Sequence, residues 1–239
     1  MAREKMQVDE LLEFTRALSI DHLGLALDLL YRSRDLSMRP ERPWSWILAG
    51  RSALSSVLHS FAGLESAVNL IGHQLFFDTD SPRFIPHESR SIPLKRMLKA
   101  WRAALPLADK LNLVLSVSDC SLPPGLENEL RELTTLRNWI AHGIPYKSVV
   151  LVQPQADGTL LEVDREDSVD WPTKFPNTKF HSPDMFDHND AYTANRIVFE
   201  IIRFLATATD ELFFVQTWEK GPNTITLGRD SDLEDLLRS

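Results

Sequence analysis

Residues 136–143 read Leu-Arg-Asn-Trp-Ile-Ala-His-Gly, and this stretch decides the fold that the sequence predicts. It closes a predicted helix, because Pro123 and Pro124 suit a first turn while Gly143 and Pro145 end the helical conformation. Between these limits, apolar residues recur at helical spacing: Leu126, Leu130, Leu133 and Ile140. The pattern predicts a helix with one face in a core.

Arg137 falls within that apolar stripe, where another leucine would be expected. An unpaired buried guanidinium is costly, so its side chain has to meet a carboxylate, a helix end, a subunit boundary or an anionic ligand. His142 stands in the last turn, and histidine exchanges protons near neutral pH. Each residue alone has a simpler explanation. An arginine stem can cover apolar surface, and a histidine before glycine commonly ends a helix.

Taken together, Arg137, Asn138, His142 and Gly143 form one pattern, with four residues between the arginine and the histidine. It resembles the signature of the HEPN superfamily, in which a histidine follows an arginine a few residues later and a polar residue commonly stands directly after the arginine. The resemblance implies a helical bundle with the motif on its third core helix. It also implies catalytic roles for Arg137, Asn138 and His142.

A long helix predicted from about Pro43 to about Phe77 agrees with this resemblance. Its apolar residues alternate steps of three and four: Leu54, Val57, Phe61, Leu64, Val68, Ile71 and Leu75. Segment 61–69 is similar to the first core helix of many HEPN proteins, which makes Glu65 the candidate to face Arg137. Asn69 and His73 follow Glu65 at four-residue spacing as supporting residues. These three side chains can equally form a solvated or subunit-facing edge.

We therefore expect a mainly α fold, a HEPN-like bundle of four to five core helices with a small β-hairpin inserted after the motif helix. The expected units are an N-terminal helical extension (1–40), the HEPN-like domain (41–220) and an acidic C-terminal tail (221–239). The insertion covers about 146–188, where apolar runs flank Asp157-Gly158 and indicate a hairpin. Leu94 to Val117 reads as helical with a bend at Pro106, and a last helix is marked from Ala194 to Val215.

Composition limits the class of protein. The chain has 239 residues, 43% of them hydrophobic, without an apolar run long enough for a membrane span. Its beginning lacks the apolar block of a signal peptide, and its single cysteine, Cys120, excludes an intrachain disulfide, so we expect a cytoplasmic protein.

The charge balance bears on RNA as a ligand. With 26 Lys and Arg against 34 Asp and Glu, the net charge of −8 repels a polyanion, so any RNA surface has to be local. The candidate basic patch lies near Trp101 and contains Arg90, Lys95, Arg96, Lys99 and Arg102. Such a run is more often a solvated face.

The motif residues fit cleavage of RNA without a metal or another cofactor. The 2′-hydroxyl is the nucleophile, Arg137 makes a forked contact to phosphate, and His142 transfers protons as general acid or base. Asn138 orients the substrate or the histidine. The products would carry 2′,3′-cyclic phosphate and 5′-hydroxyl ends.

A separate acidic and histidine-rich segment lacks a recognised metal-ligand spacing: His181, Asp184, Asp187, His188 and Asp190. In it, Asp187 or Asn189 can equally cap a helix.

On one straight helix, residues five apart point about 140° away from each other, so Arg137 and His142 need a loosened turn or a second motif helix. HEPN nucleases resemble the arrangement with a second motif helix, which implies a homodimer with a composite site.

The first functional hypothesis is thus an endoribonuclease of the toxin or antiviral abortive-infection type, controlled by an antitoxin or another regulatory protein. The alternative is a non-catalytic HEPN module for dimerisation, RNA binding or complex assembly. One toxin branch carries a tyrosine that its antitoxin modifies, where this chain has Ile144.

Overall fold

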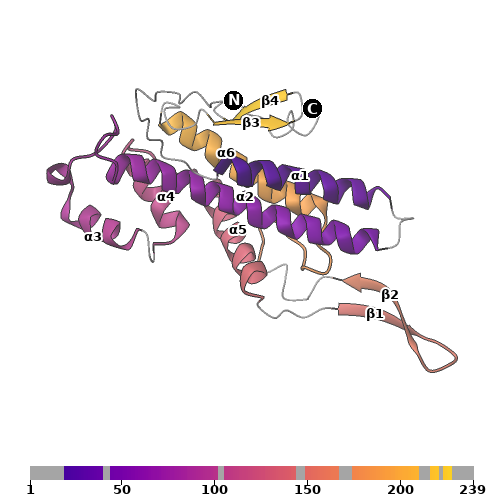
Figure 1. The fold of residues 1–239 in the computed structure, drawn as a ribbon. Coiled ribbons are helices and arrows are strands. Elements are labelled where there is room, and N and C mark those ends of the chain that lie inside the picture. Colours follow the sequence, from indigo (N-terminus) through magenta and orange to yellow (C-terminus); the bar gives the residue numbers. More distant parts are fainter. Residues whose placement is uncertain are drawn as a thin grey trace, which may run out of the picture.

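The structure is a computed structural model that describes residues 19–39, 44–101, 105–143, 149–166, 174–209, 216–220 and 223–227. This part of the chain is mainly helical (Figure 1). Its helices are α1 (Ser19–Ser37), α2 (Ser45–Phe76), α3 (Ile92–Ala100), α4 (Leu107–Ser116), α5 (Pro124–His142) and α6 (His188–Ala208), with a short 3-10 turn, η1 (His87–Ser89). Two antiparallel strand pairs complete it: β1 (Val149–Pro154) with β2 (Leu160–Glu166), and β3 (Gln216–Lys220) with β4 (Asn223–Leu227).

Helix α2 is the central helix of the bundle, and α1, α4, α5 and α6 all pack against it. The apolar stripe predicted from its sequence is buried from Val57 to Leu75, with Val57, Leu64 and Ile71 each 0% exposed. Leu54, at the start of the stripe, is half-buried. Burying each such side chain contributes about 1.5–3 kcal/mol. The predicted limits of this helix, about 43 and 77, are confirmed within two residues.

Buried hydrogen bonds connect α1 and α6 to α2. Ser56 on α2 donates its hydroxyl to the carbonyl of Ala26 on α1 and accepts from the amide of Asn195 on α6, at 2.6 and 2.9 Å. Ser33 on α1 likewise donates to the carbonyl of Ala49 at 2.9 Å. Small side chains at these positions let the helix backbones approach closely. The described part of the N-terminal segment therefore shares one core with α2 and α6.

The chain turns sharply after α2, and Arg90 holds that turn. Arg90 is 7% exposed, and its guanidinium donates to the carbonyl oxygens of Phe76 and Ile85 at 2.7 and 2.6 Å. Arg90 thus caps the end of α2 and is unavailable as part of the predicted basic patch. The expected helical region 94–117 is divided into α3 and α4, and Pro106 immediately precedes α4, as a proline at a helix start would do.

Helix α5, the motif helix, has the limits that its prolines and glycine predicted. Gly143 adopts the left-handed conformation at φ 57°, and its N–H donates to the carbonyl of Ile140. Leu130, Leu133 and Leu136 are buried on the face toward α2 and α6. The apolar stripe is thus confirmed up to the turn that carries Arg137.

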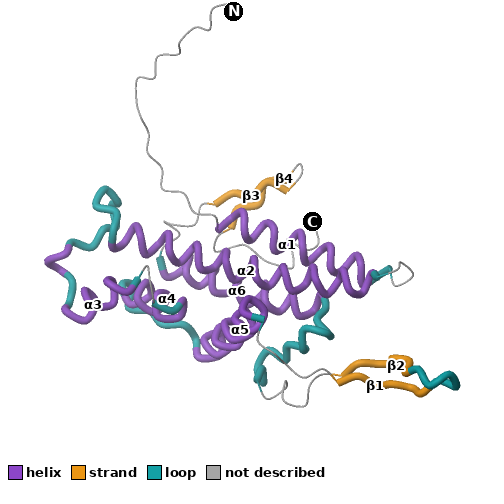
Figure 2. The backbone as a smooth tube through the Cα atoms, turned by 60° about the horizontal axis from the view of Figure 1, so that its bottom comes forward, coloured by secondary structure: helices purple, strands orange, loops and turns teal. Residues whose placement is uncertain are grey.

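The predicted hairpin after the motif helix is present as β1 and β2, and it projects away from the bundle in both views (Figures 1 and 2). Its register pairs Val152 with Glu162, and a bulge interrupts the ladder next to Leu151. Apolar side chains on both faces remain exposed: Val150, Leu151, Val152, Leu160 and Leu161. The loop that begins at residue 174 packs against the bundle, unlike the hairpin, because Phe175, Phe180 and Phe186 are buried in the core.

The C-terminal part differs from the sequence prediction. Helix α6 ends at Ala208, whereas the sequence pattern extended it to Val215, and residues 210–215 lie outside the described part of the chain. The pair β3 and β4 was not predicted, and β4 falls within the expected acidic tail 221–239. In the described part of the chain, every helix is too short or too polar to cross a bilayer.

Candidate functional site

The motif lies on the last two turns of α5, where Arg137 packs against α2. The guanidinium carbon lies 5.2 Å from the centroid of the Phe61 ring, within the range of a cation–π contact. Its Nη1 donates to the side-chain oxygen of Asn138 at 3.0 Å. No carboxylate among the described residues pairs with this half-buried cation. Arg137 is therefore held in place and keeps unused N–H donors.

His142 is the last residue of α5, and its side chain is exposed. The helix is regular α from Pro124 to His142, so the turn does not loosen between the two motif residues. At 100° a residue, Arg137 and His142 point about 140° apart. The described chain thus places the arginine against α2 and the histidine in solvent, and it does not bring the two together.

Glu65 and Asn69, the residues expected to support Arg137, contact Lys110 of α4. The Lys110 side chain donates to the amide oxygen of Asn69 at 3.0 Å and lies 3.9 Å from a carboxylate oxygen of Glu65. Lys110 is 6% exposed and also lies over the ring of Trp101, 5.7 Å from its centroid. These contacts neutralise a buried cation and fasten α4 to α2. Glu65 thus has a partner other than the motif arginine.

His73, the third expected supporting residue, is half-buried on the same helix as Glu65 and Asn69. Its ring lies 6.3 Å from that of Phe77, and its buried Nδ1 has no hydrogen-bond partner among the described residues. Because no described motif side chain contacts it, His73 remains apart from Arg137, Asn138 and His142.

The predicted basic patch is only partly formed on α3. Arg96 and Lys99 are exposed and Lys95 is half-buried, while Arg102 lies outside the described residues. Trp101 is 3% exposed and packs edge-on against Phe76, so its ring is closed to a nucleic-acid base. In Figure 1, α3 lies beside α4 at one end of the bundle, far from the hairpin that follows the motif. The patch and the motif therefore occupy different parts of the molecule.

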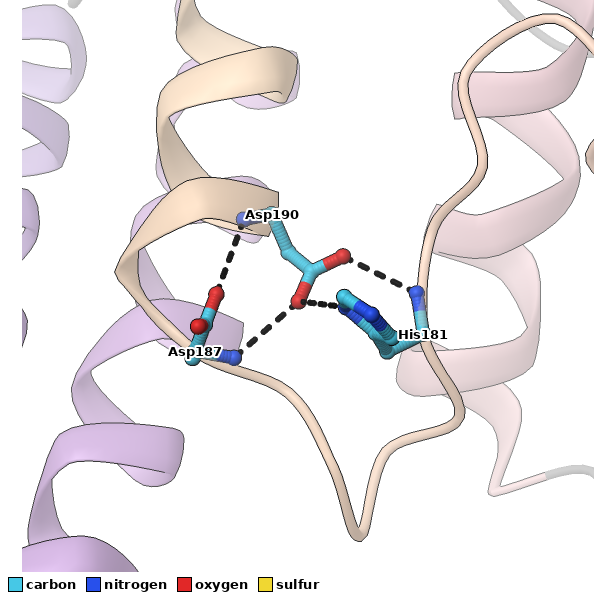
Figure 3. Close-up of side chains that lie close together, drawn as sticks. All are labelled: His181, Asp187 and Asp190. Atoms are coloured by element: carbon cyan, nitrogen blue, oxygen red, sulfur yellow. Dashed lines mark hydrogen bonds and ion pairs between the residues drawn. The ribbon is translucent and has the colours of Figure 1, made fainter. Parts of the chain in front are cut away.

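His181, Asp187 and Asp190 form a compact cluster at the start of α6 (Figure 3). Asp190 is 3% exposed; its carboxylate accepts from the backbone N–H groups of His181 and Asp187 and lies 3.0 Å from Nδ1 of His181. Asp187 accepts from the N–H groups of Asn189 and Asp190, which completes a capping box. These carboxylates cap α6 and anchor the preceding loop. Neither Asp184 nor His188 belongs to the cluster.

Two acidic residues of α5 that the sequence did not single out fix the position of the motif helix. Glu132 is 7% exposed, and its carboxylate accepts from backbone and side chain of both Asn177 and Thr178, at 2.6 to 3.0 Å. Glu129 pairs with Arg196 of α6 at 2.7 Å. The only sequence signal for Glu132 was a carboxylate beside the buried Leu133. Its partners are 45 and 46 residues away, beyond any local pattern.

Comparison of the chain with family models, curated proteins and solved structures found no match. The side chains of α5 and their surroundings are therefore the basis for assigning a function.

Proposed function

We propose that this chain is a metal-independent endoribonuclease of the HEPN type, with Arg137 as phosphate ligand and His142 as proton-transfer group. The observation that carries the proposal is the environment of Arg137. A half-buried guanidinium that rests on Phe61 and Asn138, without a described carboxylate, is a ready ligand for an external anion. A purely structural arginine at this depth would be expected to have its charge paired within the fold.

The chemistry needs two proton transfers and one cation. One histidine removes the proton from the 2′-hydroxyl, whose oxygen attacks the adjacent phosphorus. The bond from phosphorus to the 5′-oxygen breaks, and a second histidine gives that oxygen a proton. Arg137 stabilises the additional charge on the phosphate oxygens in the transition state. The products are a 2′,3′-cyclic phosphate and a free 5′-hydroxyl.

A second copy of the chain supplies the missing geometry. Because α5 is regular up to His142, one copy cannot point its arginine and its histidine at the same phosphate. Two copies related by a two-fold axis can place the exposed histidine of one beside the arginine of the other. We therefore infer a homodimer in which the ends of two α5 helices form one cleft.

The test is cleavage of total RNA and of tRNA, with a chelator present, by the wild type, Arg137→Ala and His142→Ala. Arg131→Ala is the matched control, because Arg131 lies on the same helix but is exposed and pairs with Glu127. We expect cleavage to cyclic phosphate ends by the wild type and Arg131→Ala, and a loss of at least about a hundredfold in the two motif variants. Equal activity, or equal inactivity, of all four folded proteins would contradict the proposal.

A non-catalytic role in dimerisation, RNA binding or complex assembly is the second candidate, and the net charge of −8 favours it. It predicts RNA binding or dimerisation without cleavage by any variant. A role as a toxin or antiviral effector, controlled by an antitoxin or regulatory protein, would follow only from the first candidate. Growth arrest on expression of the wild type, absent for His142→Ala, would test that role.

A further inference from the structure

A local excess of positive charge surrounds α3, at the end of the bundle where α2 ends (Figure 1). Within residues 83–99, five Lys and Arg residues stand against one acidic residue, in a chain whose net charge is −8: Arg83, Arg90, Lys95, Arg96 and Lys99 against Glu88. Arg90 is occupied by carbonyl oxygens at the end of α2. The other three cations of α3 form no ion pair within the described part of the chain.

These three cations share the outward face of α3. At 100° per residue on this regular helix, Lys95, Arg96 and Lys99 fall within one arc of about 100°. Arg96 and Lys99 are exposed, and Lys95 is half-buried. Leu94 and Trp101 pack into the core and point about 150° to 170° away from the middle of that arc. We call the surface formed by the three cations the α3 basic face.

The helix itself does not account for these charges. The start of a helix is the positive end of its dipole and is stabilised by acidic residues. The first turn of α3 contains no acidic residue, and Lys95 and Arg96 stand in the half of the helix nearest that end. The dipole and the side chains therefore add to one positive potential, which suits an anionic ligand.

We propose that the α3 basic face binds the phosphate backbone of a double-stranded arm of the RNA substrate. The surroundings of this face favour phosphates over unpaired bases, because Trp101 is 3% exposed and the Phe84 ring lies against the Arg90 guanidinium. A duplex keeps its bases stacked inside and presents one phosphate charge per about 1.7 Å. The choice of RNA rests on the proposed ribonuclease function, which this inference deepens by naming where the substrate is held outside the motif.

The length of α2 agrees with one folded RNA reaching both places. Phe61, which contacts Arg137, lies fifteen residues before Phe76, and 1.5 Å of rise per residue places the two levels about 22 Å apart. Phe76 is joined to the start of α3 through Arg90. At about 3.4 Å per pair, this distance corresponds to roughly seven base pairs of a duplex. An arm of that length can lie on α3 while its unpaired end reaches the motif.

The experiment measures binding of a labelled RNA duplex of about 16 base pairs by fluorescence anisotropy, over about 50 to 200 mM salt. A His142→Ala background keeps the RNA intact. We expect Lys95→Gln, Arg96→Gln and Lys99→Gln each to make the logarithmic salt dependence shallower by about 0.9. Each should weaken binding about eightfold at 0.1 M salt, because a slope of 0.9 corresponds to that factor between about 1 M and 0.1 M.

Arg51→Gln is the matched control, because it removes one exposed charge from the other end of α2 and should leave the salt slope unchanged. A second control is Ile92→Ala, which removes a side chain that lies in the same arc and is 67% exposed. Phosphate contacts do not need this side chain, whereas insertion into a lipid surface does. Ile92→Ala should therefore bind the duplex as the parent does.

Unchanged binding by the triple variant of Lys95, Arg96 and Lys99 would overturn the inference, even where the wild type cleaves RNA. An equal loss in Arg51→Gln would also overturn it, because the effect would then come from net charge. So would binding of anionic lipid vesicles, in place of the duplex, that is lost in Ile92→Ala. Duplex binding that depends on the three cations, in a chain that never cleaves RNA, would support the α3 basic face and contradict the nuclease.

Discussion

Glu132 gives the strongest prediction for a single residue, because its buried carboxylate accepts four hydrogen bonds from Asn177 and Thr178. Glu132→Ala leaves these donors without an acceptor. We expect the free energy of unfolding to fall by about 2–4 kcal/mol, since hydrogen bonds to a buried charge are strong and unsatisfied donors are costly. Urea unfolding followed by circular dichroism measures this change.

Glu127→Ala is the control for that prediction, because Glu127 lies on the same helix and pairs with Arg131 at the surface. Loss of such an exposed pair should change stability by no more than about 0.5 kcal/mol. If Glu132→Ala were as stable as Glu127→Ala, the carboxylate would not be the anchor of the loop.

His22 and His59 give a prediction about pH. Their Nδ1 atoms lie 3.1 Å apart between α1 and α2. Burial, reinforced by the charge of His22, lowers the pKa of His59 below its usual value of 6.5. The unfolded chain therefore binds a proton at His59 more readily than the folded protein does, and stability should fall as the pH drops below 6.5 and toward the lowered pKa.

Urea unfolding at pH 8 and pH 5 tests the direction of this pH dependence of stability. We expect the wild type to be less stable at pH 5, and we expect His59→Asn to show a smaller difference between the two pH values. His22→Asn should also reduce the difference, because it removes the neighbouring charge. A larger pH dependence in either variant than in the wild type would contradict the assignment of His59.

Local patterns predicted residue positions better than residue partners. The stripe on α5 placed Arg137 correctly at a half-buried position, because three- and four-residue spacing fixes which face of a helix a residue occupies. The partner of Glu65 was not predictable in the same way. Lys110 comes from α4, 45 residues away, and its approach depends on how α4 docks. A resemblance in one helix does not contain that information.

At the scale of elements, two glycines in helices give opposite predictions. A Cβ at Gly72 would collide with the ring of Trp101, whereas a Cβ at Gly125 meets no atom within 4 Å. We expect Gly72→Ala to lower the free energy of unfolding by about 1–3 kcal/mol through overpacking. Gly125→Ala should raise it by about 0.5–1 kcal/mol, because alanine favours the helix. Thermal unfolding of both variants measures the contrast; two changes of equal sign would contradict the packing described for α2.

Elements with strong local stop signals were predicted well. Such signals act on the backbone within a few residues, and the observed ends of the elements follow them. They are the proline before α5, the glycine after it and Asp157-Gly158 between β1 and β2. The end of α6 and the β3–β4 pair lacked such signals. The apolar rhythm after Ala208 continued to Val215, but spacing alone does not state where a helix stops.

At the scale of the whole molecule, the proposed composite cleft predicts that an inactive subunit inactivates its partner. The proposed reaction uses one histidine from each copy, so a mixed dimer of wild type and His142→Ala holds a single histidine in its cleft. We expect an equal mixture of the two proteins to cleave RNA at about a quarter of the wild-type rate, because only about a quarter of the dimers carry both histidines, and we expect activity to fall on dilution as dimers dissociate. Sedimentation should find a dimer at micromolar concentration. A monomer with full activity would contradict the composite cleft.

The mainly α class was predictable from the sequence, but the arrangement of the helices was not. The sequence pattern treated residues 1–40 as an extension, whereas the leucines of α1 lie in the same core as α2: Leu23, Leu27 and Leu30. The helical period shows that a segment has an apolar face, but it does not show which other face covers it. That information lies in contacts between distant residues.

The hydrogen bond between Asn195 and Ser56 joins residues 139 positions apart. During synthesis, α1 and α2 emerge first and can pair, but the side of α2 that α6 covers stays open to water until α6 has been translated. For that interval the nascent chain exposes an apolar surface along α2. A stalled or truncated product that ends before His188 would lack α6, the helix that covers this side of the core, and we expect proteases to degrade it.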